Sequence, residues 1–491
     1  MADVLRVLFL AAEADPFIKI GGLGDVAGSL PRALLTVAQE LDYPIDVRLV
    51  IPFHGAIQRQ NYPLRPIAKF DISSSLGPFS AEALTMDFDG LPVYFIAGTP
   101  IPPDAPVYTS NPGLDGRKFV FFSLAALEMA RTLGWPPHIV HANDWHTAPA
   151  IYALGLRRDH DPFYYHTTTL LGLHNLPYLS VGAGEALSEF GLPPATGSPL
   201  PEWAQNMPLP LGLLAADHIV AASPHYAKEI MTPEFGSGLD AFLRKRADAI
   251  SGILNGIDQN RWDPRTDPAL PRCFDEERLD QRLENKAALQ AELGLEINPG
   301  VPLLSMVTRL DYQKGVDLAF TALRLLDDRP WQAVFLGTGD PKLEEAAREL
   351  ADAYPDRVRT AIRFDIALSR HIYGGADMIL IPSRYEPCGL TQMIGMRYGC
   401  VPVARATGGL SDTIDDFTRS ADSTGFLFKK ASPLALAGAL RRALDAYTQP
   451  DVWQGLQVRG MLRDFSWNRF ARQYLDLYQF MVEGRQFEQQ K

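Results

Sequence analysis

A lysine and several glycines stand between a predicted strand and a predicted helix in residues 17–28, FIKIGGLGDVAG. The glycines allow the main chain to approach a ligand closely. A helix that starts near Asp25 adds unpaired N–H groups and the positive end of its dipole, and Lys19 adds a side-chain cation. This combination predicts an anion-binding turn, and we expect the ligand to carry phosphate.

A second turn of the same character occupies residues 308–315, TRLDYQKG, which follow the apolar run 301–307. Two such turns suggest two nucleotide-binding lobes. We hypothesise that Lys19 from one lobe and Arg309 and Lys314 from the other hold a single diphosphate.

A third cluster lies in residues 382–392, PSRYEPCGLTQ, between a predicted strand at 378–381 and a predicted helix. Glu386 therefore lies at the carboxyl end of a strand, where doubly wound sheets bind ligands. The amides of Gly389, Leu390 and Thr391 should be unpaired at the helix start. A carboxylate next to an anion site is electrostatically unfavourable unless it binds hydroxyl groups or stabilises a developing positive charge. A glucose ring supplies both.

Two other features near this turn are open to more than one interpretation. Cys388 has no base identifiable from the sequence, so a small buried thiol is favoured over a nucleophile. The glycine-then-helix pattern at 408–412, GGLSD, is equally consistent with a ligand-facing turn and with a tight connection.

Polar residues also end two apolar runs in the N-terminal half, at 141–146 (HANDWH) and 172–175 (GLHN). Both should lie at the carboxyl edge of the first sheet, near Lys19. The spacing does not suit a zinc site, so no metal is expected. Substrate contact is favoured over a purely structural role: His174 would donate a hydrogen bond to a sugar hydroxyl, and Asp144 could accept one from an incoming acceptor.

The glycine turn also satisfies the G-x-G-x-x-A pattern of dinucleotide-binding proteins, through Gly22, Gly24 and Ala27. A nicotinamide-binding lobe should present an acidic residue after its second strand, yet the run 47–51 continues into Pro-Phe-His. No Gly-Lys-Ser/Thr follows the glycines either, which argues against a Walker loop. A purely geometric turn would leave Lys19 unexplained.

The bulk composition limits the classes of protein to consider. The 491 residues exceed the roughly 250–300 that one core supports, so two domains are expected. A net charge of −12 argues against nucleic acid or an anionic membrane as the main partner. The N-terminus lacks a leader pattern, and no apolar run approaches the ~18 residues of a membrane span. We therefore expect a soluble, cytoplasmic protein.

Apolar runs alternate with amphipathic stretches in both halves of the chain, which predicts an α/β fold with two doubly wound, largely parallel sheets. We expect domains at 1–252 and 253–464. The final stretch, 465–491, should be a helix that packs back on the first domain. Residues 178–210 are rich in Pro, Gly and Ser and should form loops and short helices.

The three turns and the histidine clusters together resemble the ADP-glucose-dependent glycogen and starch synthases, from about residue 6 to Tyr474. The resemblance is most specific at 232–236 (TPEFG) and 386–392. It implies the GT-B fold, with the first domain on the acceptor side and the second binding the nucleotide sugar. The implied reaction moves glucose from ADP-glucose to the non-reducing end of an α-1,4-glucan, with retention of configuration and without a cofactor or metal.

The same resemblance implies roles for individual residues. Lys19, Arg309 and Lys314 would hold the diphosphate. The residues that it places around the rest of the donor are Gly21, Gly22, Asn255, Phe364, Cys388, Gly389, Leu390 and Thr391, with Phe364 stacked on adenine. His174 and Glu386 would meet the donor glucose, and Asp25 and Asp144 would lie toward the acceptor.

One segment departs from the family pattern. Where these synthases usually carry a helix with lysine, residues 207–212 read MPLPLG, and prolines disrupt a helix interior. The preceding residues 176–203 diverge as well. Two alternatives therefore stay open: a GT-B transferase that uses another nucleotide sugar or a smaller acceptor, and a glucan-binding protein that has lost turnover.

Overall fold

The computed structural model describes residues 4–58, 60 and 62–489 and divides into two compact units. The first contains the described residues up to Gly256 together with those from Trp467 onward, and the second spans residues 257–466. The division thus falls at 256/257 and 466/467, whereas the predicted boundaries lay at 252/253 and 464/465. Asn255 consequently belongs to the first unit.

A mixed sheet forms the centre of the first unit, with the strand order β3-β4-β5-β2-β1-β6-β7-β8-β9. Strands from β5 to β9 in this order pair in parallel, and β3 and β4 add an antiparallel extension. The strands are β1 (Leu5–Leu10), β2 (Ile45–Pro52), β3 (Arg65–Ile72), β4 (Phe79–Phe88), β5 (Leu91–Gly98), β6 (Ile139–Asn143), β7 (Thr168–Leu173), β8 (His218–Ala221) and β9 (Ile250–Gly252).

Helices cover both faces of this sheet and enclose two apolar cores. The helices are α1 (Gly22–Glu40), α2 (Gly55–Gln58), α3 (Pro112–Thr132), α4 (Asp144–Arg157), α5 (Gly184–Glu189), α6 (Pro208–Ala215), α7 (Pro224–Glu229), α8 (Asp240–Lys245) and α17 (Trp467–Gln489), with short 3₁₀ turns at Arg158–His160, Glu202–Ala204 and Ala247–Ala249. Parallel strands with helices on both faces are the doubly wound arrangement that the sequence predicted.

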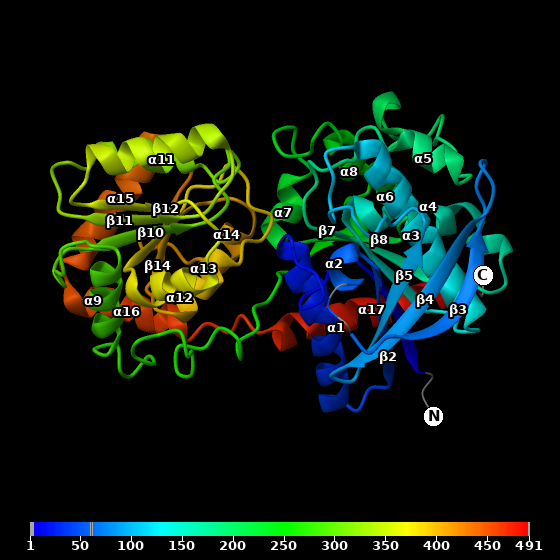
Figure 1. The fold of residues 1–491 in the computed structure, drawn as a ribbon, viewed down its shortest axis with the longest axis horizontal. Helices are drawn as coiled ribbons and strands as arrows, with labels where there is room; N and C mark the ends of the chain where they lie inside the picture. The colour runs from blue at the N-terminus through cyan, green and yellow to red at the C-terminus, as the bar shows by residue number, and fades with distance from the viewer. Residues whose placement is uncertain (1–3, 59, 61, 490–491) are drawn as a thin grey trace. The chain divides into compact units, whose positions relative to one another are not determined.

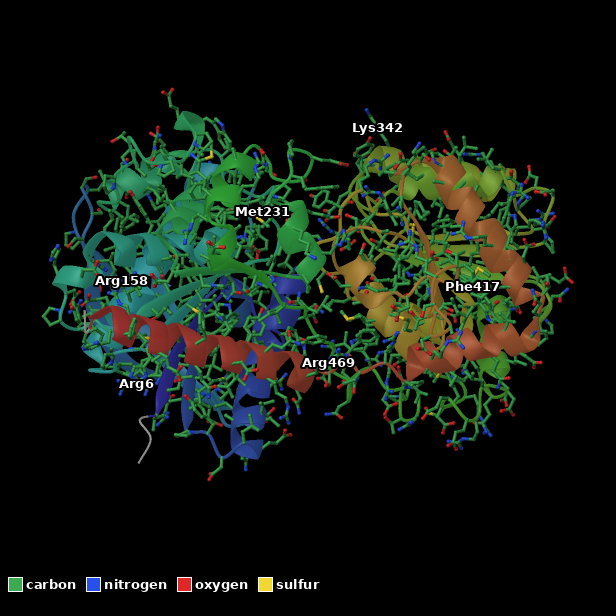
Figure 2. All side chains as sticks on the ribbon, turned by 180° about the vertical axis from the view of Figure 1, so that it is seen from behind. Arg6, Arg158, Met231, Lys342, Phe417 and Arg469 are labelled. Atoms are coloured by element: carbon green, nitrogen blue, oxygen red, sulfur yellow. The ribbon has the colours of Figure 1, made fainter. Side chains whose placement is uncertain are left out.

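Arg158, labelled in Figure 2, links the amino-terminal ends of β7 and β8. The glycine turn follows the opposite, carboxyl end of β1. Its guanidinium binds both oxygens of the Asp217 carboxylate. That carboxylate also accepts hydrogen bonds from the main chain and the hydroxyl of Thr169, at 2.8 and 2.9 Å. This ion pair therefore has a structural role.

The last helix, α17, lies along α1 in the first unit (Figure 1). Its aromatic residues Phe470, Tyr474 and Tyr478 are buried in the same core as the first strand. The hydroxyl of Tyr478 and Nδ1 of His141 on β6 share a hydrogen bond of 2.7 Å. The aromatic spacing seen in the sequence therefore marks the face of α17 that packs on the sheet.

Replacing Tyr478 by phenylalanine should lower the free energy of unfolding of the first unit by about 1–2 kcal/mol, because the buried ring nitrogen of His141 loses its partner. Urea denaturation followed by near-UV circular dichroism measures this change. Tyr178→Phe is the matched control, since Tyr178 is 52% exposed. Equal midpoints for both variants would contradict a stabilising role for the buried bond.

The prolines in residues 207–212 do not disrupt a helix, so this expectation was wrong. Helix α6 begins at Pro208, with Met207 as its N-cap. Both prolines lie in the first turn, where main-chain N–H groups have no partner within the helix, and a proline there removes no hydrogen bond. The first main-chain bond of the helix, from the amide of Leu211 to the carbonyl of Met207, is intact at 3.1 Å.

The second unit contains a parallel sheet with the strand order β12-β11-β10-β13-β14-β15. Its strands are β10 (Leu303–Val307), β11 (Gln332–Leu336), β12 (Val358–Ala361), β13 (Met378–Ile381), β14 (Val401–Arg405) and β15 (Phe426–Phe428). Its helices are α9 (Arg282–Glu292), α10 (Val316–Arg324), α11 (Pro341–Ala353), α12 (Ile366–Gly375), α13 (Thr391–Arg397), α14 (Gly408–Thr413), α15 (Pro433–Tyr447) and α16 (Pro450–Met461).

Helix α11 covers one side of this second sheet, and α12 and α13 cover the other (Figure 1). The core formed with α10, α11, α15 and α16 contains buried residues from most of the strands. The order of the strands reverses between β10 and β13, which are neighbours although β11 and β12 separate them in the chain. Such a reversal is the position at which doubly wound sheets bind ligands. The predicted fold class of two Rossmann-like units is confirmed.

Candidate active site

The carboxyl ends of β10 and β13 bring the predicted basic and acidic residues of the second unit together. The ammonium group of Lys314 lies 2.8 and 2.7 Å from the two oxygens of Glu386. Ser383 donates a further hydrogen bond of 2.8 Å to Glu386. Glu386 is only 6% exposed. The direction of this buried carboxylate is thus fixed by a cation and a hydroxyl group.

A small cavity of about 60 Å³ opens beside this pair. Its lining includes Thr308, Lys314, Ser383, Glu386 and the residues 389–392 at the start of α13. No main-chain hydrogen bond from Gly389, Leu390 or Thr391 is formed to the part of the chain that the structure describes. A carboxylate, an ammonium group and a row of amides without a main-chain acceptor therefore line one pocket. The sequence predicted these features on two separate turns, and the structure joins them.

The glycines at 408 and 409 support the turn that carries Glu386. A side chain at Gly408 would meet the carbonyl oxygen of Glu386 at 1.9 Å, and one at Gly409 would meet that of Cys388 at 2.2 Å. The amide of Gly409 also donates to the Glu386 carbonyl, at 3.1 Å. Of the two interpretations of this pattern, the structure therefore supports a tight connection. Cys388 is a buried thiol, 5% exposed.

Two predicted ligand residues of the second unit lie at the surface. Arg309 has a side chain 61% exposed, and its guanidinium is 3.4 Å from the Asp311 carboxylate. Phe364 is 86% exposed, which is unusual for a phenylalanine. Neither side chain is needed for packing, so both are free to bind a ligand.

In the first unit, Asp144 and His174 lie together at the ends of β6 and β7. The carboxylate of Asp144 accepts hydrogen bonds from the amides of His174 and Asn175, at 2.7 and 3.3 Å. The ring of His174 meets the side-chain oxygen of Asn143 at 2.9 Å. Asp144 has a φ of 53°, a left-handed conformation that is uncommon for residues other than glycine.

Burial determines the charge of the imidazole. It lowers the pKa of His174, although Asp144 opposes this shift, so the ring is neutral near pH 7. The pKa of Asp144 is raised by burial, against the effects of His174 and of the two amide bonds. The amide nitrogen of Asn143 donates to the Leu10 carbonyl, so its oxygen faces His174, and Nε2 of the neutral ring donates to it. The unpaired Nδ1 can therefore only accept a hydrogen bond from a sugar hydroxyl, and the expectation that His174 donates one is corrected.

Several polar atoms of these residues are buried without a partner in the described part of the chain. They are Nδ1 of His174, Oδ1 of Asn175 and Oδ1 of Asn255. Buried polar atoms in native proteins are nearly always hydrogen-bonded, so the unpaired atoms of His174 and Asn175, on the predicted polar turn 172–175, indicate a ligand position. Asn255 itself is 7% exposed.

The other histidines of the cluster 141–146 are structural. His141 is 1% exposed and binds Tyr478, on the core side of β6. His146 packs against Phe119 and Trp145, with ring centroids 4.7 and 4.2 Å away. Burial lowers the pKa of both rings, so neither carries charge at neutral pH. Asn143 is fully buried as well, and its side-chain amide is bonded to Leu10 and His174. Asp144 is therefore the residue of this cluster that we assign to substrate contact.

More groups of the glycine turn have partners within the protein than the sequence suggested. Lys19 forms an ion pair of 2.6 Å with Asp25. The amides of Ile20, Gly21 and Gly24 donate to the carboxylate of Glu13. The expectation that the amides of this turn are generally free is therefore corrected, because an internal carboxylate binds three of them.

Among the described residues, the amides of Gly22 and Leu23 have no acceptor. They are the amides left to a ligand, whereas the Lys19 ammonium is paired with Asp25.

Glu13 was missed in the sequence. The clue was a carboxylate directly after an apolar strand and a few residues before the glycines. Its position at a strand end, like that of Glu386, places it at the ligand-binding edge of the sheet.

The part of the chain that the structure describes contains neither a candidate metal cluster nor a membrane-spanning helix. No group of three or more His, Cys, Asp or Glu side chains in residues 4–58, 60 and 62–489 could hold a metal ion. Over the same residues, no helix combines the length and the apolar character needed to cross a bilayer.

Comparison with known families assigns both units. Residues 6–245 match the family described as "Starch synthase catalytic domain", and residues 293–454 match "Glycosyl transferases group 1". The first match includes the strands of the first sheet except β9 and the first residue of β1, and the second match includes the whole sheet of the second unit.

Similar proteins cover the whole chain. A glycogen synthase of Anaeromyxobacter dehalogenans is 41% identical over 98% of this chain and 100% of its own length. A glycogen synthase of Thermotoga maritima is 39% identical over 96% of this chain and 98% of its own.

Solved structures agree with these relatives. The catalytic domain of starch synthase IV from Arabidopsis thaliana, bound to ADP and acarbose, superposes with a TM-score of 0.86 at 32% identity, over 98% of this chain and 100% of that one. A sucrose-phosphate synthase from Thermosynechococcus elongatus shares the fold, with a TM-score of 0.60 at 21% identity, over 98% of this chain and 100% of that one. The chain therefore belongs to the glycogen and starch synthases, GT-B enzymes that transfer a glycosyl unit from a nucleotide sugar to a glucan.

Proposed function

We propose that the donor is ADP-glucose and that glucose is added to the non-reducing end of an α-1,4-glucan with retention of configuration. The observation that carries this proposal is the Lys314–Glu386 pair beside the free amides of residues 389–391. A cation and a carboxylate 2.7 Å apart suit a reaction that separates charge over a short distance.

The proposed chemistry follows from the charges. Breaking the bond between glucose and phosphate leaves negative charge on ADP and positive character on the sugar. Lys314, Arg309 and Lys19 stabilise the leaving diphosphate, and Glu386 stabilises the sugar. Since three cations neutralise the leaving group, we propose that no metal or other cofactor is needed.

The remaining predicted residues surround the donor and the acceptor. His174 and Asn255 offer their unpaired atoms to hydroxyl groups of the donor glucose. Gly21 and Gly22 approach the diphosphate, and the exposed ring of Phe364 stacks on adenine. Asp25 and Asp144 lie toward the acceptor. We assign no side chain as a covalent nucleophile. Retention of the anomeric configuration then implies that the acceptor hydroxyl attacks on the same face of the sugar from which the diphosphate leaves.

The choice of ADP over another nucleotide draws support from the similar starch synthase, whose structure contains ADP. The test is incubation with glycogen and either ADP-glucose or UDP-glucose, with and without EDTA, while polymer growth and nucleotide release are followed. We expect glycogen-dependent ADP release and polymer growth that EDTA does not reduce. A clear preference for UDP-glucose would overturn the donor assignment, and loss of activity in EDTA would overturn the metal-free mechanism.

Ser383→Ala should lower kcat about fivefold, because Glu386 loses a hydrogen bond of 2.8 Å that fixes its direction, worth about 1 kcal/mol. Steady-state kinetics with ADP-glucose measures the change. Ser369→Ala is the matched control, since Ser369 is also buried in the second unit but donates to the carbonyl of Ile366. Equal kcat values for both variants would show that Ser383 does not orient the carboxylate.

A further inference from the structure

Glu13 is a buried carboxylate to which the reaction described above assigns no role. It is 1% exposed and lies three residues after the end of β1. Burial raises its pKa, while hydrogen bonds from the amides of Ile20, Gly21 and Gly24 act in the opposite direction. Burying a carboxylate without a basic partner is costly, so its retention requires an explanation.

The hydrogen bonds of Glu13 determine the shape of the glycine turn. One oxygen accepts from the amides of Gly21 and Gly24, at 3.1 and 3.3 Å, and the other accepts from Ile20 and, at 3.2 Å, from Gly21. Gly21 is the N-cap of α1 and has no side chain to cap the helix. Glu13 therefore supplies the missing cap from another part of the chain, at the positive end of the helix dipole.

Tyr108 lies beside this carboxylate. Burial and, after it, the charge of Glu13 raise the pKa of the Tyr108 hydroxyl. The Tyr108 ring packs against Phe119 and His146, with centroids 6.2 and 5.1 Å away. Glu13 is thus in contact with a part of the chain distant from the turn in sequence.

Two amides at the start of α1 are not bound by Glu13. They belong to Gly22, which is exposed, and to Leu23, which is buried, and neither has an acceptor in the described part of the chain. We propose that Glu13 is a positioning residue for the donor, which fixes the turn so that Lys19 and these two amides meet the diphosphate. This inference rests on the proposed function, because it assumes that the glycine turn binds the donor.

The test compares Glu13→Gln with the full-length wild-type enzyme and with Glu82→Gln, a carboxylate on β4 paired with Lys69. We would measure steady-state kinetics with ADP-glucose and glycogen, binding of ADP by calorimetry, and hydrogen exchange at residues 20–24. We expect the variant to raise KM for ADP-glucose and Kd for ADP about tenfold, with kcat changed less than threefold and KM for glycogen unchanged. Amide exchange at residues 20–24 should accelerate, and Glu82→Gln should behave as wild type.

Other outcomes are decisive as well. Unchanged ADP binding by Glu13→Gln would overturn the inference. Tighter ADP binding would overturn it too, because it would mean that Glu13 competes with the phosphate for the amides of the turn. If Glu13→Gln does not fold, Tyr108→Phe is the variant to measure. We expect its KM for ADP-glucose to rise about threefold and its KM for glycogen to stay unchanged. An unchanged KM for ADP-glucose would overturn the inference.

If wild type neither binds ADP nor uses ADP-glucose, the proposed function has failed. Hydrogen exchange then still shows whether Glu13 orders the turn, and unchanged exchange in Glu13→Gln overturns that claim too.

Discussion

Glu386→Ala should lower kcat by about 10²–10³-fold while Kd for ADP stays equal to that of wild type or falls. The carboxylate lies 2.7 Å from the Lys314 ammonium, and no second acidic residue lines the small cavity of described residues beside it. Its removal takes away the group that stabilises positive character on the sugar. It also releases Lys314 from its ion pair, so the cation becomes fully available to the diphosphate.

Single-turnover kinetics and calorimetric titration with ADP separate these two effects. Glu345→Ala is the control, because Glu345 is a 63% exposed carboxylate on α11 of the same unit. A thermal melt establishes that the variant is folded. If kcat were unchanged and KM for ADP-glucose rose, Glu386 would contribute to binding alone, and the proposed charge separation would be wrong.

Lys19→Ala and Arg309→Ala should each weaken use of ADP-glucose by about 2–4 kcal/mol in transition-state stabilisation, about 30- to 1,000-fold in kcat/KM. The Arg309 side chain is 61% exposed, and that of Lys19 is 39% exposed. Their removal should therefore leave the melting temperature nearly unchanged, so the kinetic effect can be assigned to the ligand.

The controls for this pair are exposed cations outside the proposed site. Lys342, labelled in Figure 2, is exposed at the start of α11, and Arg348 on the same helix has a side chain 50% exposed. Lys342→Ala and Arg348→Ala should leave kcat/KM within twofold of wild type. Unchanged efficiency in both Lys19→Ala and Arg309→Ala would refute a diphosphate held by these two side chains.

The sequence predicted the fold because both units follow regular alternation of apolar strands and amphipathic helices. The hairpin of β3 and β4 was not predicted. Most residues of β3 are exposed or half-buried, so the strand lacks the apolar run by which the others were recognised. The start of α6 was misjudged for a different reason: whether a proline breaks a helix depends on its position in the first turn, and a helix start is the least certain part of a prediction.

The candidate site was predicted in its parts but not in its connections. Strand ends followed by glycine-rich helix starts identified Lys314 and Glu386 as separate features. Their pairing depends on β10 and β13 being neighbours, which the order of residues along the chain does not state. Glu13 was missed for a similar reason. Its partners lie seven to eleven positions further along, and only the folded turn brings their amides onto one carboxylate.

We propose that the diphosphate of one ADP-glucose is bound by Lys19 from the first unit and by Arg309 and Lys314 from the second. A crystal structure of the complex with ADP would show where these three side chains lie. We predict phosphate oxygens within about 3 Å of the ammonium groups of Lys19 and Lys314 and of the Arg309 guanidinium. A complex in which the diphosphate binds with any of these side chains turned away from it would contradict the claim.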